Sequence, residues 1–239
     1  MLNANNRFNL TQQVAEKLGK AIVRGDYGPH NPVPSEAIIC KQLEVSRSAT
    51  REAVKSLAAK GLITSRARQG IRVLPESQWN LFDADVLRWL RDTNPSLELL
   101  KEFAELRVAV EPEAAALAAT RQNREKIDLI GVALNKMLLA ETGGADPLEA
   151  DIEFHKSILS ASENRFFMQL GRTIDATLRV AIQFTNRRSG VPAASHTDHK
   201  LIYDSIASGL SSQAAQASRD LLDEALESIA NAINERDKL

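Results

Sequence analysis

Positive charge and hydroxyl groups gather in one short segment of the sequence, residues 45–57. Because Arg47, Arg51 and Lys55 are spaced four residues apart, they form one cationic row if the segment is an α-helix. Arginine can bond a guanine edge through two hydrogen bonds, and hydroxyl groups can reach phosphates or bases. The candidate DNA-facing residues of this helix are Ser46, Arg47, Ser48, Thr50 and Arg51. For this segment taken alone, the alternative is a solvated helix face with scattered arginines.

The neighbouring segments are those that a winged helix-turn-helix requires. Residues 9–24 have the apolar spacing of an amphipathic helix, and Pro34-Ser35-Glu36 begins a second, shorter one. After the basic helix, residues 62–65 and 71–74 have strand character and enclose a hairpin tip with a glycine. We therefore predict a winged helix-turn-helix over residues 1–74. Its further candidates for contact with DNA are Ser35, Arg66, Arg68 and Gly70.

The charge of the chain is unevenly divided between its two parts. Residues 1–74 hold 12 Lys or Arg against 5 Asp or Glu, a formal net charge of +7, whereas residues 75–239 hold 18 against 26, a net charge of −8. This asymmetry indicates a basic module that meets a polyanion and an acidic module with another task. The 239 residues suit a small reading head plus one domain of about 150 residues.

Composition also bears on the compartment. The sequence shows neither the apolar run of a membrane span nor that of a signal peptide, so we expect a cytoplasmic protein. Cys40 is the single cysteine, which rules out an internal disulfide, and its apolar neighbours Ile38, Ile39 and Leu43 favour a packing role.

Beyond residue 74 the apolar periodicity becomes helical. We predict a linker with a linker helix over residues 75–95 and an all-α helical bundle over residues 96–239, which makes the fold class mainly α. The predicted helices are Asp83–Asp92, Ser96–Thr120, Arg124–Glu141, Pro147–Ser162, Arg165–Asn186, Ser195–Ser208 and Gln213–Arg236.

Several motifs follow one another in the N-terminal part: Val33-Pro-Ser-Glu36, Val45-Ser-Arg47, Arg51-Glu-Ala53, Gly61-Leu-Ile63 and the wing Gly70-Ile-Arg-Val73. In this order they resemble the DNA-binding domain of GntR-family transcription regulators. The resemblance implies that the candidate residues of the basic helix approach an operator and that the wing enters the adjacent minor groove. One departure is Ala37, where many members of the FadR-type branch have an arginine, so a contact with DNA is expected to be missing there.

The C-terminal part carries a second set of motifs: Phe103-Ala-Glu-Leu-Arg107, Glu111-Pro-Glu-Ala-Ala, Asp151-Ile-Glu-Phe-His155, Asn164 and Asp198–Ile206. This set resembles the FCD effector domain of FadR-type regulators. The resemblance implies an effector-binding and dimerisation domain, and thus a homodimer on double-stranded operator DNA. Trp79-Asn80, Asp83, residues 85–87 and Trp89 also resemble the linker of sugar-acid regulators, which implies a small carboxylate or sugar-acid effector.

A metal site is predicted on one helix of this domain. Asp151 and His155 lie four residues apart, so both can reach one divalent ion, although a surface ion pair is the alternative. FCD domains commonly bind a metal, and the resemblance adds His199 as a ligand, with zinc as the expected ion. Where other members place a further histidine, about 22 residues on, this chain has Leu221. His196 is an open substitute, with a capping or surface role as its alternative.

An effector clamp is predicted nearby. Arg107 lies in an otherwise apolar helix and would need an anionic partner there, for which Glu111 is the local alternative. The resemblance implies that Arg107 clamps the carboxylate of an effector. Arg179, Thr185 and Asn186 are candidates for contact with its hydroxyl groups.

These features together predict a ligand-responsive DNA-binding regulator, a repressor of sugar-acid or related carboxylate catabolism that a small acid releases from its operator. One alternative is a metal-dependent hydrolase with a tethering N-terminal domain, since three candidate ligands could activate water. However, the sequence offers no evident general base or nucleophile paired with them. Another alternative is a helical interaction module without a small ligand.

Overall fold

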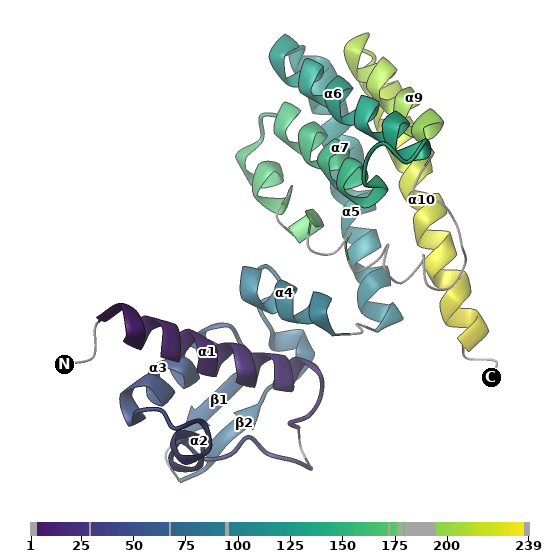
Figure 1. The fold of residues 1–239 in the computed structure, drawn as a ribbon. Coiled ribbons are helices and arrows are strands. Elements are labelled where there is room, and N and C mark those ends of the chain that lie inside the picture. Colours follow the sequence, from purple (N-terminus) through teal and green to yellow (C-terminus); the bar gives the residue numbers. More distant parts are fainter. Residues whose placement is uncertain are drawn as a thin grey trace. The chain divides into compact units, whose positions relative to one another are not determined.

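The computed structural model describes residues 4–28, 30–66, 68–93, 96–171, 173–175, 179 and 195–236. The chain forms two compact units, Met1–Asn94 and Pro95–Leu239. Both are built mainly from helices, as predicted, and the small sheet formed by the described residues belongs to the first unit (Figure 1). In the part of the chain that is described, no helix is long and apolar enough to cross a membrane.

The first unit contains the predicted winged helix-turn-helix. Its elements are α1 (Ala4–Val23), α2 (Glu36–Leu43), α3 (Arg47–Ala59), β1 (Ile63–Arg66) and β2 (Gly70–Val73). The strands pair antiparallel, with Ile63 opposite Val73 and Arg66 opposite Gly70. Gly70 has a φ of 76°, a left-handed conformation that suits glycine at the end of a tight turn. The strands therefore form a short wing after α3.

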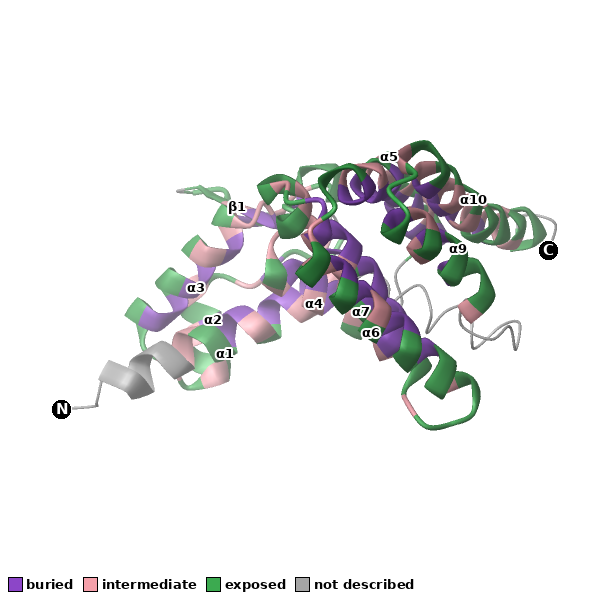
Figure 2. Ribbon diagram, turned by 90° about the horizontal axis from the view of Figure 1, so that it is seen from above, coloured by how far each residue is buried: buried purple, intermediate pink, exposed green. Residues whose placement is uncertain are grey.

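One apolar core holds these elements together. Buried residues repeat along α1 and α3 at helical spacing, and Figure 2 shows buried and exposed positions alternating along both helices. The start of α3 is set by Ser46, whose hydroxyl accepts a hydrogen bond from the backbone N–H of Ala49 at 3.2 Å. The core residues of α1 and α3 are Val14, Leu18, Ile22, Ala53, Val54 and Leu57.

The linker helix packs on the reading head. A 3₁₀ turn (Glu76–Gln78) leads into α4 (Ala84–Asp92), and the indole of Trp89 on α4 is 1% exposed. Its Nε1 donates to Oε2 of Glu16 on α1 at 2.8 Å. The ring lies over Gly19, where an added Cβ would come within 2.4 Å of it. The compact first unit therefore extends through the predicted linker helix to Asn94.

The second unit is the predicted all-α bundle. Its elements are α5 (Leu97–Arg121), α6 (Arg124–Glu141), α7 (Pro147–Ala161), α9 (His196–Ala207) and α10 (Ser211–Arg236). Residues 165–171 and 173–175 are helical as well, whereas the end of the predicted helix Arg165–Asn186 lies outside the described residues.

The core of this unit brings α7 and α9 together. Phe154 of α7 and Ile202 of α9 are fully buried, and Ile130 of α6 joins them in one apolar cluster. α10 lies beside α5, with Ile229 packed in a smaller cluster against Leu100. This packing fixes the polar side chains that α7 and α9 carry into the interior.

Candidate DNA-reading surface and metal centre

The N-terminal end of α3 presents an exposed cationic surface. Ser46, Arg47 and Ser48 are exposed at its first turn, where backbone N–H groups and the helix dipole favour phosphate. Arg47 forms no ion pair with any described residue. The side chain of Arg51 is 65% exposed, with its Nε 3.9 Å from a carboxylate oxygen of Glu36. Within the first unit, these side chains are exposed enough to contact a DNA duplex.

Thr50 requires a correction. Its side chain is fully buried, and its Oγ1 donates to the backbone carbonyl of Ser46 at 3.3 Å and accepts from the thiol of Cys40 at 3.2 Å. Thr50 therefore joins α2 to α3 and does not face DNA, so its assignment as a DNA-facing residue was wrong. The sequence did contain a signal for this, because Thr50 precedes the buried Val54 by one helical turn.

The remaining candidates lie on the second helix and the wing. Arg66, Arg68 and Gly70 are exposed around the hairpin turn. Ser35 is exposed at the N-terminus of α2, and its side chain makes no capping hydrogen bond. These residues have the exposure that contact with DNA requires, and their predicted contacts remain predictions.

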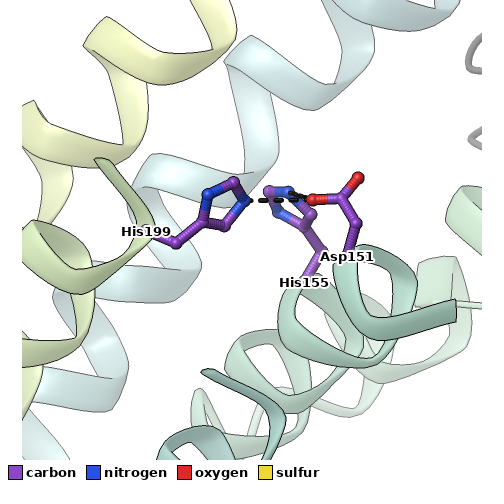
Figure 3. Close-up of side chains that lie close together, drawn as sticks. All are labelled: Asp151, His155 and His199. Carbon is purple, nitrogen blue, oxygen red and sulfur yellow. Dashed lines mark hydrogen bonds and ion pairs between the residues drawn. The ribbon is translucent and has the colours of Figure 1, made fainter. Parts of the chain in front are cut away.

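In the second unit, α7 and α9 bring together the three predicted metal ligands. Asp151 and His155 come from α7 and His199 from α9, and all three point toward one another (Figure 3). Nε2 of His199 lies 3.0 Å and Nε2 of His155 3.4 Å from Oδ1 of Asp151. All three residues are buried, and their ligand atoms lie within 4.8 Å of one another. The open alternative of a surface ion pair is therefore wrong for Asp151 and His155.

The hydrogen bonds behind the two imidazoles show that this group fits a cation. Nδ1 of His199 lies 3.0 Å from the backbone carbonyl of Ser195, which can only accept, so this nitrogen carries the proton. Nδ1 of His155 is likewise held, 2.6 Å from Oε2 of Glu111. When both rings are neutral, each Nε2 atom directs a lone pair at Asp151. The two nitrogens and the carboxylate oxygen are then all acceptors, so a proton or a metal ion must lie between them. Imidazoles that donate their other N–H to an oxygen are typical of zinc sites.

The pKa values of Glu111, Asp151 and His155 depend on a balance between burial and their hydrogen-bonded, charged neighbours. Burial acts to raise the pKa of Glu111, but the charges of Arg107 and His155 outweigh burial and lower the pKa to about 2. Burial likewise acts against ionisation of Asp151, yet its hydrogen bonds and charge interactions with His155 and His199 hold its pKa below the usual range. For His155, burial would lower the pKa, and the charge of Glu111 instead raises it to about 8.

The other histidine and the position of the missing ligand lie outside this group. His196 begins α9, where its backbone N–H donates to Oε1 of Glu141 at 3.1 Å. Among the described residues, the group that could hold a metal comprises Asp151, His155 and His199 and does not include His196. Leu221 is partly buried and packs against the apolar core. From the residues that the structure describes, the site thus has three protein ligands.

The predicted effector residues are described only in part. Arg107 is 7% exposed, and its Nε donates to Oε1 of Glu111 at 2.5 Å, so Glu111 is its anionic partner in this structure. Arg179 is paired with Glu149 and with Asp175, and its Nε lies 3.1 Å from the latter. Thr185 and Asn186 lie outside the described residues.

An exposed basic helix-turn-helix with a wing, followed in the same chain by a helical bundle with a buried Asp–His–His group, defines the class of ligand-sensing DNA-binding regulators. The chain belongs to the GntR family. Residues 10–73 match the family described as "Bacterial regulatory proteins, gntR family", and residues 102–224 match the FCD domain.

Known relatives support this membership. The chain is 34% identical to the galactonate operon transcriptional repressor of Escherichia coli (strain K12), over 83% of this chain and 87% of that protein. It is 36% identical to the uncharacterized HTH-type transcriptional regulator YieP of the same strain, over 66% of this chain and 70% of that protein. A solved structure titled "Lar controls the expression of the Listeria monocytogenes agr system and mediates virulence" shares the fold, with a TM-score of 0.57, 18% identity and coverage of 92% and 96% of the two chains.

The family membership decides between the predicted functions. The chain is a DNA-binding transcription regulator and not an enzyme, which removes the hydrolase alternative.

Proposed function

We propose that this regulator is a repressor of sugar-acid or related carboxylate catabolism and that a small acid effector releases it from its operator. Two findings support the proposal. The galactonate operon repressor is similar over most of both chains. The second unit also contains a buried group of three metal ligands near a buried arginine, which together form an environment suited to a carboxylate. The buried group of metal ligands near Arg107 is the observation on which the proposal mainly rests.

The metal site would hold a divalent cation, with zinc as the expected ion, on Asp151, His155 and His199. When bound, the ion supplies positive charge that carboxylate and hydroxyl oxygens can ligate. Three protein ligands leave room for such oxygens, because the fourth coordination position of the ion stays open, whereas a protein ligand fills it in a closed structural site. Leu221 stands where other members of the family are expected to place a further histidine, so we expect the site to lack that ligand.

Arg107 is the proposed clamp for the effector's carboxylate. Its guanidinium has five N–H donors, and Nε and Nη2 are directed at Glu111, which leaves donors for a second anion. Arg179 contributes if it exchanges part of its pairing with Glu149. Thr185 and Asn186 complete the proposed set of contacts with hydroxyl groups.

On DNA, two copies of the chain would place their α3 helices in successive major grooves of a pseudo-palindromic operator. A winged helix covers only a few base pairs, and a two-fold symmetric dimer matches two half-sites. We assign direct contact with base edges to Arg47 and Arg51, and contact with the backbone to Ser35, Ser46 and Ser48. The wing residues Arg66, Arg68 and Gly70 would enter the minor groove.

Release requires that the effector bind the operator-competent and operator-incompetent arrangements with different affinity. The chain connection between the units follows α4, which is fixed to the reading head through Trp89 and Glu16.

The test is an operator titration with the full chain. An operator is first selected from a random duplex pool, and binding is then followed by fluorescence anisotropy with D-galactonate, D-gluconate and further hexonates, before and after chelation. We expect at least one acid to weaken operator binding in a zinc-dependent way and to raise the melting temperature. If no acid of the panel changes either quantity, the chain is a helical interaction module without this class of effector.

A further inference from the structure

Five buried side chains of the second unit form a continuous row of hydrogen bonds and ion pairs. Arg107 pairs with Glu111, Glu111 with His155, His155 with Asp151, and Asp151 with His199. The row joins α5 to α7 and α7 to α9. Glu111 is its only member that contacts both the predicted clamp Arg107 and a predicted metal ligand, His155.

We propose that Glu111 is the positioning residue of the metal centre: by accepting the Nδ1–H of His155, its carboxylate presents Nε2 of that ring to the ion. The inference rests on the proposed metal site and adds a residue that does not itself ligate the ion.

The two oxygens of Glu111 are divided between its partners. Oε1 accepts from Nε of Arg107 at 2.5 Å, whereas Oε2 lies 2.6 Å from Nδ1 of His155. Because Glu111 is 2% exposed, water cannot replace either interaction without opening the core. The pairing with Arg107 holds the carboxylate in place, so that Oε2 remains directed at the imidazole.

His155 needs this support more than the other two ligands do. The Nδ1 of His199 is held by a backbone carbonyl, that of Ser195, which the start of α9 fixes. The Nδ1 of His155 is held by a side chain from another helix, α5. Phe154 contacts the ring of His155 only edge to face, with ring centroids 5.8 Å apart, which does not select a tautomer. Without Glu111, a neutral His155 can adopt the tautomer with its proton on Nε2 and donate to Asp151, which removes it as a ligand.

The first experiment compares Glu111→Gln with Glu113→Gln in the full chain. Glu113 lies on the same helix and is exposed, so its variant is a matched control. Zinc affinity is measured by competition with a chromophoric chelator. Loss of a carboxylate partner behind a ligating histidine weakens metal binding by about 10- to 100-fold, and we expect this for Glu111→Gln, with Glu113→Gln unchanged. Binding by Glu111→Gln within twofold of wild type overturns the proposal.

The second experiment needs no variant, so it holds even if Glu111→Gln fails to fold. Long-range ¹⁵N–¹H correlation spectra of the four histidines are recorded for the wild-type chain with and without zinc. We expect His155 to be protonated at Nδ1 and to bind zinc through Nε2. In the zinc-loaded protein, a His155 ring that binds through Nδ1 or stays protonated at Nε2 overturns the positioning role while leaving the metal site intact. If the wild-type chain takes up neither zinc nor manganese, the proposed metal site is itself overturned, and this inference with it.

Discussion

Gly19→Ala tests whether the linker helix is part of the reading head. An alanine in the middle of α1 should by itself stabilise the helix by about 1 kcal/mol relative to glycine. However, its Cβ would lie 2.4 to 2.6 Å from three ring atoms of Trp89, well inside van der Waals contact. The ring cannot move aside easily, since it is 1% exposed and its Nε1 is bonded to Glu16.

The sign of the effect follows from comparing these two contributions. Overpacking of a core typically costs about 1 to 3 kcal/mol, and here the clash is with a rigid ring, so we place it at the upper end. The free energy of unfolding of the first unit should therefore fall by roughly 1 to 2 kcal/mol after the gain in helix propensity is deducted. Truncation of the ring in Gly19→Ala/Trp89→Leu should remove the clash. The double variant should therefore lose less free energy of unfolding than the two single variants lose in sum.

The assay is urea unfolding of the full chain followed by tryptophan fluorescence. Both tryptophans, Trp79 and Trp89, belong to the first unit, so the signal reports on that unit alone. Gly28→Ala, where an added Cβ meets no atom within 4 Å, is the control and should leave the transition nearly unchanged. A Gly19→Ala variant as stable as wild type, or more so, would refute the packing of α4 on α1.

Three further predictions concern the DNA surface and the metal centre. Arg47→Ala should weaken specific operator binding by about 1 to 3 kcal/mol and reduce the base preference at one position of the operator. Arg124→Ala, a change at an exposed residue of the second unit, is the control and should alter neither. If Arg47→Ala binds the operator as tightly as wild type, Arg47 does not read the operator sequence. Thr50→Val should lower the free energy of unfolding by about 1 kcal/mol yet keep the base preference of the operator, because the Thr50 hydroxyl is buried; an altered base preference in a selection experiment would contradict this. For the chelated protein, the raised pKa of His155, about 8 against 6.5, contributes stability that is complete below pH 6.5 and is lost as the pH rises through 8. Urea unfolding of the second unit, followed by circular dichroism because both tryptophans lie in the first unit, should differ by about 2 kcal/mol between pH 6 and pH 8.5, and His155→Gln should abolish that difference.

Local signals in the sequence predicted most of the fold. The serine before Arg47 and the Asp146-Pro147 pair mark helix starts that the structure confirms, because a cap acts on backbone groups within the next turn. Glycine at the hairpin tip has the same local character. The three metal ligands came from the family resemblance together with helical spacing, since His199 lies on a different helix from Asp151 and His155.

Contacts between distant segments were not accessible in the same way. The packing of Trp89 over Gly19 depends on the path of the chain between α1 and α4, which spacing does not encode. The sequence identified Glu111 as an alternative partner of Arg107, but its contact with His155 exists only because α5 and α7 pack side by side. Thr50 was misjudged because its hydroxyl suits DNA as well as it suits a buried bond to a neighbouring helix.

The packing of Trp89 against α1 has a practical consequence for the production of a separate DNA-binding fragment. A fragment that stops at the end of the wing, after Val73, would lack the indole that covers Gly19, leaving apolar surface of α1 in water. Glu16 would lose its bond to the indole at the same time. The shortest N-terminal fragment that folds on its own should instead extend to Asp92, so that it retains α4, which completes the apolar core.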